Sequence, residues 1–283
     1  MEQFLDLHMH TKNSDGQYYT SWLMDILQQH DLQYFSITDH DNIDSVKDMR
    51  TLEHKGKYIP GVELSSIIHD HYRIHILGYG FDENSQPMSD LCALLKEKRI
   101  RRFRLLAKAL YDKHGIEISQ QEIEDAIEVY HTPGRPHLSR IMIRNGYVNS
   151  TNEAFEKYLQ DINADIINEA DARISIETIK KAGGYAIWAH PVKCEREYQC
   201  DFTKLMPDLK AYGLDGLEIG NCLHSYSDYQ RFLDYCKKEN LLTSAGSDYH
   251  GPKVKPHAFI GQLFNDHPEI EISPQDISLL KVL

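Results

Sequence analysis

The sequence predicts an α/β fold: a barrel or parallel sheet built from strand–helix units, with a helical segment inserted in the middle of the chain. Short apolar or β-branched runs alternate with longer segments of helical periodicity, which favours this class. The stretch between residues 85 and 169 contains no convincing strand. A length of 283 residues suits one barrel, although ~150 residues per domain would give about two domains.

Seven runs are predicted to be strands because apolar and β-branched residues concentrate in them. They are Phe4–Leu7, Tyr34–Thr38, Tyr58–Leu64, Ile74–Tyr79, Tyr185–Ala189, Gly216–Ile219 and Leu242–Ala245. Helical spacing of apolar residues between several of them, as after the start signal Thr20-Ser21, predicts connecting helices. Residues 1–84 and 170–283 are therefore expected to form the barrel.

The inserted segment, residues 85–169, is predicted to be a helical cap. Leucines with helical spacing from Leu91 to Leu110 predict one long helix that ends near Gly115. Shorter helices are expected over residues 118–129, 137–144 and 153–159. Because no repeat or Gly/Ser linker separates the segments, we expect the cap to pack firmly on the barrel.

Composition limits the partners that the protein can have. The formal net charge is −12, which argues against duplex DNA and membrane surfaces as partners but not against a small phosphorylated substrate. The chain shows neither a long apolar run nor a secretory signal, so we expect a cytoplasmic location. Its five cysteines form no C-x-x-C pair, which favours reduced thiols.

The 16 histidines include several that lie in or directly after predicted strands. His8 and His10 are two residues apart on an extended backbone, so their side chains point to the same face. Carboxylates follow the same pattern, and the carboxyl ends of barrel strands meet on one face. The expected cluster contains His8, His10, Asp15, His40, Glu63, His75, His190, Asp248 and His250.

Such a cluster indicates a metal site, because several imidazoles buried together without partners would cost kcal/mol each. Imidazole and carboxylate ligands without thiolates suit Zn²⁺, Mn²⁺ or Fe²⁺. Nine ligands exceed the need of two ions and fit three. Taken singly the signals are weak: His75 alone could be a hydrogen-bonded core residue, and Asp15 alone a helix N-cap.

These residues stand in motifs that resemble one known family. The motifs are Asp6-Leu7-His8-Met9-His10, Ser14-Asp15-Gly16, Ile37-Thr38-Asp39-His40-Asp41, Pro60-Gly61-Val62-Glu63, Ala189-His190-Pro191 and Gly246-Ser247-Asp248-Tyr249-His250. They resemble the polymerase and histidinol phosphatase (PHP) family of metal-dependent phosphoesterases. Gly134-Arg135-Pro136-His137 and Ala182-Gly183-Gly184-Tyr185 resemble its TrpH/YciV-like branch, which dephosphorylates nucleoside 3′,5′-bisphosphates or trims RNA from the 5′ end.

The resemblance implies a distorted (βα)₇ barrel with three divalent metal ions. One ion would be held by His8, His10, Glu63 and Asp248. A second would be held by Glu63, His75 and His190, and a third by Asp15, His40 and His250. A metal-bound hydroxide would attack the phosphorus in line. Candidates for protonating the leaving oxygen are His190, His250 and Asp39, the last of which could instead orient a ligand histidine.

Substrate-binding residues are expected in the cap. Arg135 offers a planar fork for a second phosphate, and His137 follows it at the start of a helix; a surface ion pair is the alternative for Arg135. Arg102 resembles a family arginine near the cap, although Phe103 replaces a common Asn and charge runs on helices are usually solvated. Residues 161–166 depart from the family's Gly-Lys-Pro-Ala-Tyr-Val segment. The residues just after the last expected ligand, Lys253, Lys255 and His257, could line the mouth of the substrate pocket.

The expected function is hydrolysis of a phosphate on a small nucleotide, a nucleoside 3′,5′-bisphosphate or a short 5′-phosphorylated oligonucleotide. The alternatives are a histidinol phosphate phosphatase and a non-catalytic, metal-binding regulatory module. Histidines outside the motifs are expected to face solvent, among them His30, His54, His69, His71, His114, His131, His224 and His267.

Overall fold

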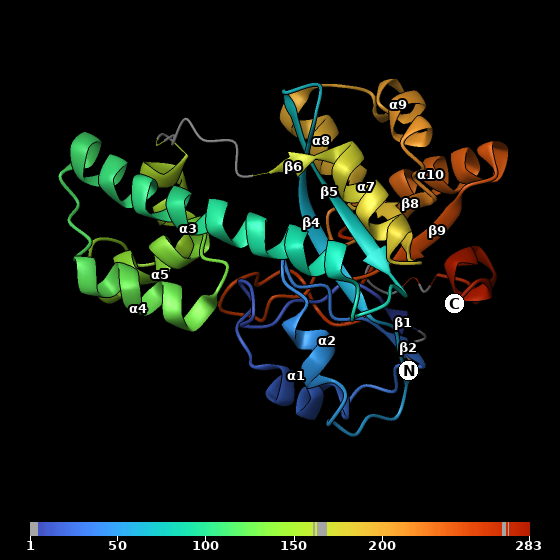
Figure 1. The fold of residues 1–283 in the computed structure, drawn as a ribbon, viewed down its shortest axis with the longest axis horizontal. Helices are drawn as coiled ribbons and strands as arrows, with labels where there is room; N and C mark the ends of the chain where they lie inside the picture. Colours follow the sequence, from blue (N-terminus) through green and yellow to red (C-terminus); the bar gives the residue numbers. More distant parts are fainter. Residues whose placement is uncertain (1–4, 161, 163–168, 268–269, 271) are drawn as a thin grey trace.

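A computed structural model describes residues 5–160, 162, 169–267, 270 and 272–283, and it shows an α/β fold with two sheets (Figure 1). The smaller sheet is parallel and contains β1 (Leu5–Asp6), β2 (Tyr34–Phe35) and β3 (Lys57–Tyr58). The larger sheet has the order β6-β4-β5-β7-β8-β9. Its strands are β4 (Gly61–Ile68), β5 (Tyr72–Tyr79), β6 (Ala170–Asp171), β7 (Tyr185–Trp188), β8 (Gly216–Gly220) and β9 (Leu242–Ala245).

The predicted strand Tyr58–Leu64 is two strands in the structure, because Pro60 lies between β3 and β4 and cannot donate to a ladder. The next connection also differs from a strand–helix unit. β4 and β5 pair antiparallel, since the turn between them is too short for a crossover. His69 and Asp70 in that turn have φ of 53° and 51°, as a tight hairpin turn requires.

A closed barrel is not formed by the described strands, so this part of the prediction is wrong. Single residue pairs join the two sheets, Met9 with Tyr249 and His40 with Glu63. The ladders stop there because the chain turns away from the strand direction. Asp41 and Asp248 have φ of 53° and 56°, and the turns at these positions carry side chains of the expected metal cluster.

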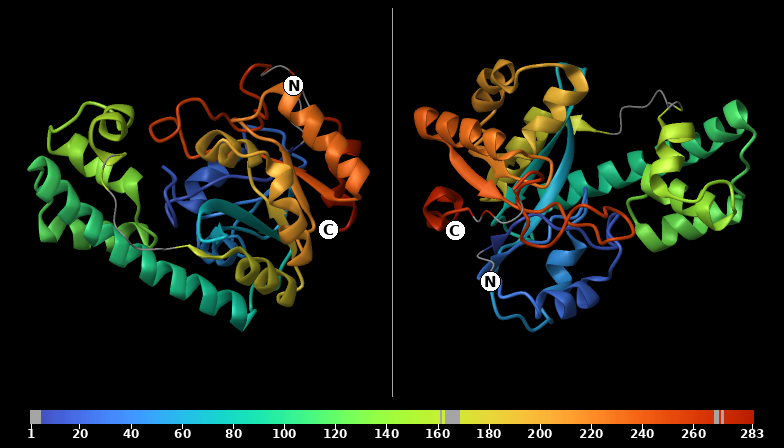
Figure 2. Two further views of the ribbon diagram at one scale, coloured as in Figure 1. Left: turned by 90° about the horizontal axis from the view of Figure 1, so that it is seen from above. Right: turned by 180° about the vertical axis from the view of Figure 1, so that it is seen from behind.

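Helices cover the sheets on their outer faces (Figures 1 and 2). They are α1 (Thr20–Leu27), α2 (Asp44–Asp48), α7 (Ala172–Lys181), α8 (Pro191–Tyr198), α9 (Met206–Ala211) and α10 (Tyr226–Glu239), with 3₁₀ turns at Phe202–Lys204, Pro274–Asp276 and Ser278–Lys281. The main apolar core lies between the large sheet and α7–α10. Among the described helices none is long and apolar enough to cross a membrane.

The helical segment projects to one side of the sheets (Figure 2). It contains α3 (Gln86–His114), α4 (Gln120–Tyr130), α5 (Arg135–Arg144), α6 (Thr151–Ala154) and a π turn at Phe155–Leu159. The predicted long helix is confirmed, and it ends at Gly115 with φ of 66°, a conformation that glycine adopts readily. The first half of α3 packs in the main core through Leu91, whereas the second half packs through Phe103 in a separate cluster with α4 and α5.

Candidate metal centre and the adjoining cavity

Glu63 on β4 lies at the middle of a cluster of imidazoles and is only 1% exposed. Its Oε2 is 3.2 Å from the Nε2 atoms of both His8 and His10, and 3.1 Å from Nδ1 of His40. Its Oε1 is 2.7 Å from Nδ1 of His75 and 3.0 Å from Nε2 of His190. One carboxylate therefore joins five histidines that come from four separate parts of the chain.

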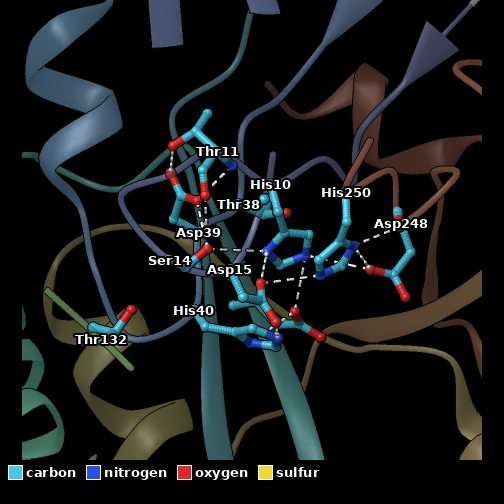
Figure 3. A network of polar contacts seen from close by, with 12 residues as sticks. His10, Thr11, Ser14, Asp15, Thr38, Asp39, His40, Thr132, Asp248 and His250 are labelled. Carbon is cyan, nitrogen blue, oxygen red and sulfur yellow. Dashed lines mark hydrogen bonds and ion pairs between the residues drawn. The ribbon is translucent and has the colours of Figure 1, made fainter. Parts of the chain in front are cut away.

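Two further carboxylates complete the cluster (Figure 3). Asp248 Oδ1 is 3.3 Å from Nε2 of His10 and 3.3 Å from Nδ1 of His250. Asp15 Oδ1 is 3.1 Å from Nε2 of His250, and the rings of His10 and His250 stack with centroids 4.0 Å apart. All nine residues of the expected cluster therefore lie together, although Glu63 and His75 lie within β4 and β5 and not at the carboxyl ends of these strands.

Within this cluster, three groups place one ligand atom per residue within 4.8 Å of one another. They are His8, His10, Glu63 and Asp248; His10, Asp15, His40 and His250; and His40, Glu63 and His75. The first group equals the first set implied by the family resemblance. The second contains the implied third set together with His10, and the third pairs Glu63 and His75 with His40 instead of His190.

Unsatisfied buried atoms show that the cluster suits cations. Five ligand atoms have no hydrogen-bond partner: His8 Nε2, His10 Nε2, His40 Nδ1, Asp15 Oδ1 and Glu63 Oε2. A buried polar atom without a partner is costly, yet the three histidine nitrogens all lie within 3.2 Å of Glu63 Oε2. Nitrogen and oxygen donors arranged in this way fit divalent metal ions.

Burial and neighbouring charges shift the pKa values of the cluster in different directions. Although burial opposes it, Asp248 and Glu63 raise the pKa of His10 to about 9. Burial alone would raise the pKa of Glu63, but His40, His75 and His8 around it hold that pKa well below its usual range. Burial lowers the pKa of His190 to about 3, even though Glu63 opposes this effect. Ionised carboxylates and neutral imidazoles are the states that bind metal ions.

Glu218 on β8 is a residue of the site that the sequence analysis missed. It is fully buried, and its Oε1 is 2.8 Å from Nδ1 of His8. Its Oε2 accepts hydrogen bonds from the backbone N–H of His190 at 2.7 Å and from Asn221. A carboxylate behind a ligand histidine fixes its ring and tautomer. The sequence does contain a signal that could have identified Glu218: it is an acidic residue inside the predicted apolar strand Gly216–Ile219.

Asp39 accepts three hydrogen bonds from the turn that precedes Asp15 (Figure 3). The donors are the backbone N–H of Thr11 at 2.7 Å, its hydroxyl at 2.6 Å and the hydroxyl of Ser14 at 2.6 Å. Asp39 lines neither of the two cavities described next. Its geometry is that of a residue that holds the 11–15 turn in place.

Two adjoining cavities open over the cluster. The smaller, about 230 Å³, is lined by seven of the nine cluster residues and by Lys255, which forms an ion pair with Asp248. The larger, about 650 Å³, reaches from the large sheet to the helical segment. The two share His75, Phe155, His190 and Lys193.

Basic side chains outnumber acidic ones in the larger cavity: it is lined by Arg73, Arg102, Arg135 and Lys193, and by Glu169 and Glu197. The Nε atoms of Arg102 and Arg135 are buried without hydrogen-bond partners. Burial and the nearby Arg135 lower the pKa of Arg102 to about 10. These are spare cationic donors, as an anionic ligand requires. Most of the 161–166 segment, in contrast, lies outside the described residues.

Two histidines have different surroundings from those that were expected. His137 lines neither cavity. It is buried, accepts a hydrogen bond from the backbone N–H of Gly134 at 2.9 Å and lies with its ring centroid 4.0 Å from that of Tyr130. His224 was expected to face solvent, and this is wrong: it is fully buried, with Nδ1 3.0 Å from the carbonyl oxygen of Ile219.

Comparison with known proteins places the chain among phosphoesterases. No protein-family model matches it. A 5′-3′ exoribonuclease of Haemophilus influenzae is 31% identical over 265 residues, which cover 89% of this chain and 92% of the relative. A 3′,5′-nucleoside bisphosphate phosphatase of Chromobacterium violaceum is 26% identical over 88% of this chain and 87% of its own length.

A solved structure from Bifidobacterium adolescentis, assigned as a metal-dependent phosphoesterase, shares the fold with a TM-score of 0.79. It covers 94% of each chain at 23% identity. The fold, the ligand cluster and the relatives define a metal-dependent phosphoesterase, which is a hydrolase. Within that class, the chain belongs to the PHP family, together with the exoribonuclease of Haemophilus influenzae.

Proposed function

We propose that the protein hydrolyses a phosphate ester at the 3′ oxygen of a nucleotide that carries a second phosphate. The substrate is a nucleoside 3′,5′-bisphosphate or a short 5′-phosphorylated oligonucleotide. One observation carries the proposal: the arginine-lined cavity adjoins the cavity over the metal cluster, and His75, Phe155, His190 and Lys193 belong to both. A ligand can therefore place one phosphate at the cluster and another among the arginines.

The arginines suit a phosphate in number and in bonding. Arg102 and Arg135 have buried N–H groups without partners, and guanidinium groups bind phosphate oxygens with two parallel hydrogen bonds. Arg73 is already paired with Glu169 at 3.1 Å. We assign Arg102 and Arg135 to direct contact with the second phosphate and Arg73 to the wall that positions it. His137 supports the start of α5, which carries Arg135.

We propose three divalent ions, Mn²⁺, Zn²⁺ or Fe²⁺, one for each of the three ligand groups, with His190 as a further ligand beside Glu63. Such ions activate water and neutralise the phosphate oxygens. Of the three residues considered for protonating the leaving oxygen, His190 and His250 line the smaller cavity, and Asp39 does not. His190 and His250 therefore stay candidates, whereas Asp39 is assigned to holding the 11–15 turn.

The proposed domains follow from the same arrangement. Residues 1–84 and 170–283 carry the cluster and form the catalytic domain, and residues 85–169 form a helical cap that supplies Arg102 and Arg135 to the cavity. A small nucleotide or a single-stranded RNA end fits this description better than duplex DNA, because most of the cavity lies between cap and sheet. The expected location in the cytoplasm stays a prediction.

A substrate comparison with metal-loaded protein tests the proposal. We expect adenosine 3′,5′-bisphosphate to have a kcat/KM at least about tenfold above that of adenosine 3′-monophosphate, since one charge-assisted hydrogen bond contributes about 1.5–3 kcal/mol. Adenosine 5′-monophosphate and histidinol phosphate should be poor substrates. Phosphate release is the measurement.

Equal kcat/KM values for the bisphosphate and the 3′-monophosphate would refute a role for the arginine cavity. Faster release from histidinol phosphate would favour the alternative enzyme. Arg173→Ala is a matched control variant, because Arg173 is exposed on α7 and paired with Glu177, away from both cavities.

A further inference from the structure

An exposed aromatic pair lies on the 12–22 segment, which also carries Asp15 of the metal cluster. Tyr19 is 45% and Trp22 is 55% exposed, and their rings meet edge to face with centroids 5.3 Å apart. Lys12 Nζ lies 4.2 Å from the centroid of the Tyr19 ring and 5.9 Å from that of Trp22. We call these three residues the Lys12–Tyr19–Trp22 platform. Large aromatic side chains left this open indicate a binding role.

The 12–22 segment, which carries the platform, is held next to the metal cluster by short-range contacts. The backbone N–H of Gln17 donates to the carbonyl oxygen of His250 at 2.7 Å, and Gln17 Oε1 accepts from the backbone N–H of Lys253 at 2.9 Å. Leu23 of α1 and Ile260 belong to one buried apolar cluster. The 12–22 and 251–260 segments therefore lie side by side at the edge of the site.

Basic residues outnumber acidic ones in the two segments. Segments 12–22 and 251–260 contain Lys12, Lys253 and Lys255, and their one acidic residue is Asp15, which is turned into the cluster; Lys255 is paired with Asp248. A cavity of about 300 Å³ beside Tyr19 adds polar groups of Asn13, Thr20 and Thr51, and the carboxylate of Asp48 in it accepts hydrogen bonds from Asn13 and Thr20. Aromatic rings with nearby cations and hydrogen-bonding groups are the surface that single-stranded nucleic acids bind.

The direction from the cluster to the platform also fits. If a terminal nucleotide lies in the arginine cavity and the next phosphate lies at the cluster, the rest of the strand must leave by the other side of the smaller cavity. Asp15, His250, Val254 and Lys255 line the smaller cavity but not the larger one. These residues lie on or next to the two segments that border the platform.

We propose that the Lys12–Tyr19–Trp22 platform binds the downstream nucleotides of single-stranded RNA whose 5′ end is in the arginine cavity. The bases stack on Tyr19 and Trp22, and Lys12 is close to the backbone phosphates. This inference rests on the proposed function, and it makes RNA ends the substrates that use the whole binding surface. None of the three platform residues lines either cavity over the cluster, so a bisphosphate nucleotide held in these cavities is expected not to use the platform.

The test compares two substrates, adenosine 3′,5′-bisphosphate and a 5′-phosphorylated RNA of ten nucleotides, in the metal-loaded protein. Because stacking contributes about 1–3 kcal/mol per base, the double variant Tyr19→Ala/Trp22→Ala should lower the ratio of kcat/KM for the RNA to that for the bisphosphate by about tenfold or more. Tyr19→Phe/Trp22→Phe keeps two rings and should retain most of the ratio. Tyr111→Ala, an exposed tyrosine near the end of α3, is the control.

A binding measurement separates this proposal from the proposed function. Fluorescence anisotropy of a labelled ten-nucleotide RNA, with protein kept in chelator, should show a Kd about tenfold weaker for the double alanine variant. An unchanged ratio together with an unchanged Kd would overturn the platform, even if the bisphosphate is hydrolysed well. Failure of the wild type on both substrates would overturn the proposed function, whereas the Kd would still report on the platform.

Discussion

The metal cluster and the arginine cavity adjoin, yet they are built in different ways. In the cluster, one carboxylate of Glu63 contacts five imidazoles within 3.2 Å, and every member has at least one charged neighbour. In the cavity, Arg102 and Arg135 line an open space of about 650 Å³ with unpaired buried N–H groups. The cluster residues depend on one another for charge and position, and we call the cluster interlocked for this reason. The cavity, in contrast, has hydrogen-bond donors without protein partners.

This difference predicts different responses to mutation. A side chain shared by several ligand groups cannot be removed without affecting all of them, because its charge and position are used by each neighbour. Basic residues around an open cavity act more independently, so the loss of one leaves the others in place. Loss of a cluster residue should therefore disable the whole cluster, whereas loss of a cavity residue should weaken substrate binding only in part.

Glu63→Gln should cause the largest loss. It keeps the shape of the side chain but removes the charge that faces His8, His10 and His40, so the affinity for divalent ions should fall together with turnover. Because metal ions supply several kcal/mol to the transition state and 1.36 kcal/mol is tenfold in rate, kcat should fall by at least about a thousandfold. Phosphate release and metal content by elemental analysis measure the two effects.

The matched control is Glu239→Gln, in which a surface carboxylate paired with Lys210 is changed in the same way. It should keep full metal content and turnover. If Glu63→Gln bound metal ions normally and lost less than about tenfold in kcat, the cluster would not be interlocked and the comparison with the cavity would fail.

Glu218→Gln should have an intermediate effect. The amide can still meet the N–H of His190, but it cannot hold a protonated Nδ1 of His8 as a carboxylate does. Loss of such a partner behind a metal ligand typically costs about 10–100-fold in metal affinity or activity. Metal titration followed by fluorescence or calorimetry is the readout, because a purely structural role would leave metal affinity unchanged.

Because the metal cluster and the arginine cavity are built differently, the sequence predicts the residues of the cluster better than those of the cavity. The alternation of side chains along an extended backbone places His8 and His10 on one face. Convergence of strand ends accounts for His40, His190, Asp248 and His250, but not for Glu63 and His75, which lie within β4 and β5. The pattern also missed the tight turn at His69 and Asp70, which makes β4 and β5 an antiparallel pair, and it wrongly predicted a closed barrel.

The cavity has no comparable signal. Arg73 comes from the edge of β5, Arg102 from α3 and Arg135 from α5, and only tertiary packing brings these elements together. Nothing in the local pattern of Arg73 distinguishes it from a solvated charge. His224 failed for a related reason: a histidine in a polar stretch can be fully buried when its ring nitrogen meets a carbonyl oxygen, here that of Ile219.

Arg73→Ala should give the smallest of these effects. Its guanidinium is paired with Glu169 at 3.1 Å and lies in the wall of the cavity, and its removal leaves Arg102 and Arg135 in place. Because a partly exposed charge contributes up to about 1 kcal/mol, KM for adenosine 3′,5′-bisphosphate should rise by at most about fivefold, with kcat changed little. Arg135→Ala should raise KM further because it removes a spare donor, and kcat for a simple phosphate ester should persist in both variants. If either substitution instead reduced kcat for the simple ester as strongly as Glu63→Gln does, the cavity would belong to the interlocked cluster and the division between the two regions would be wrong.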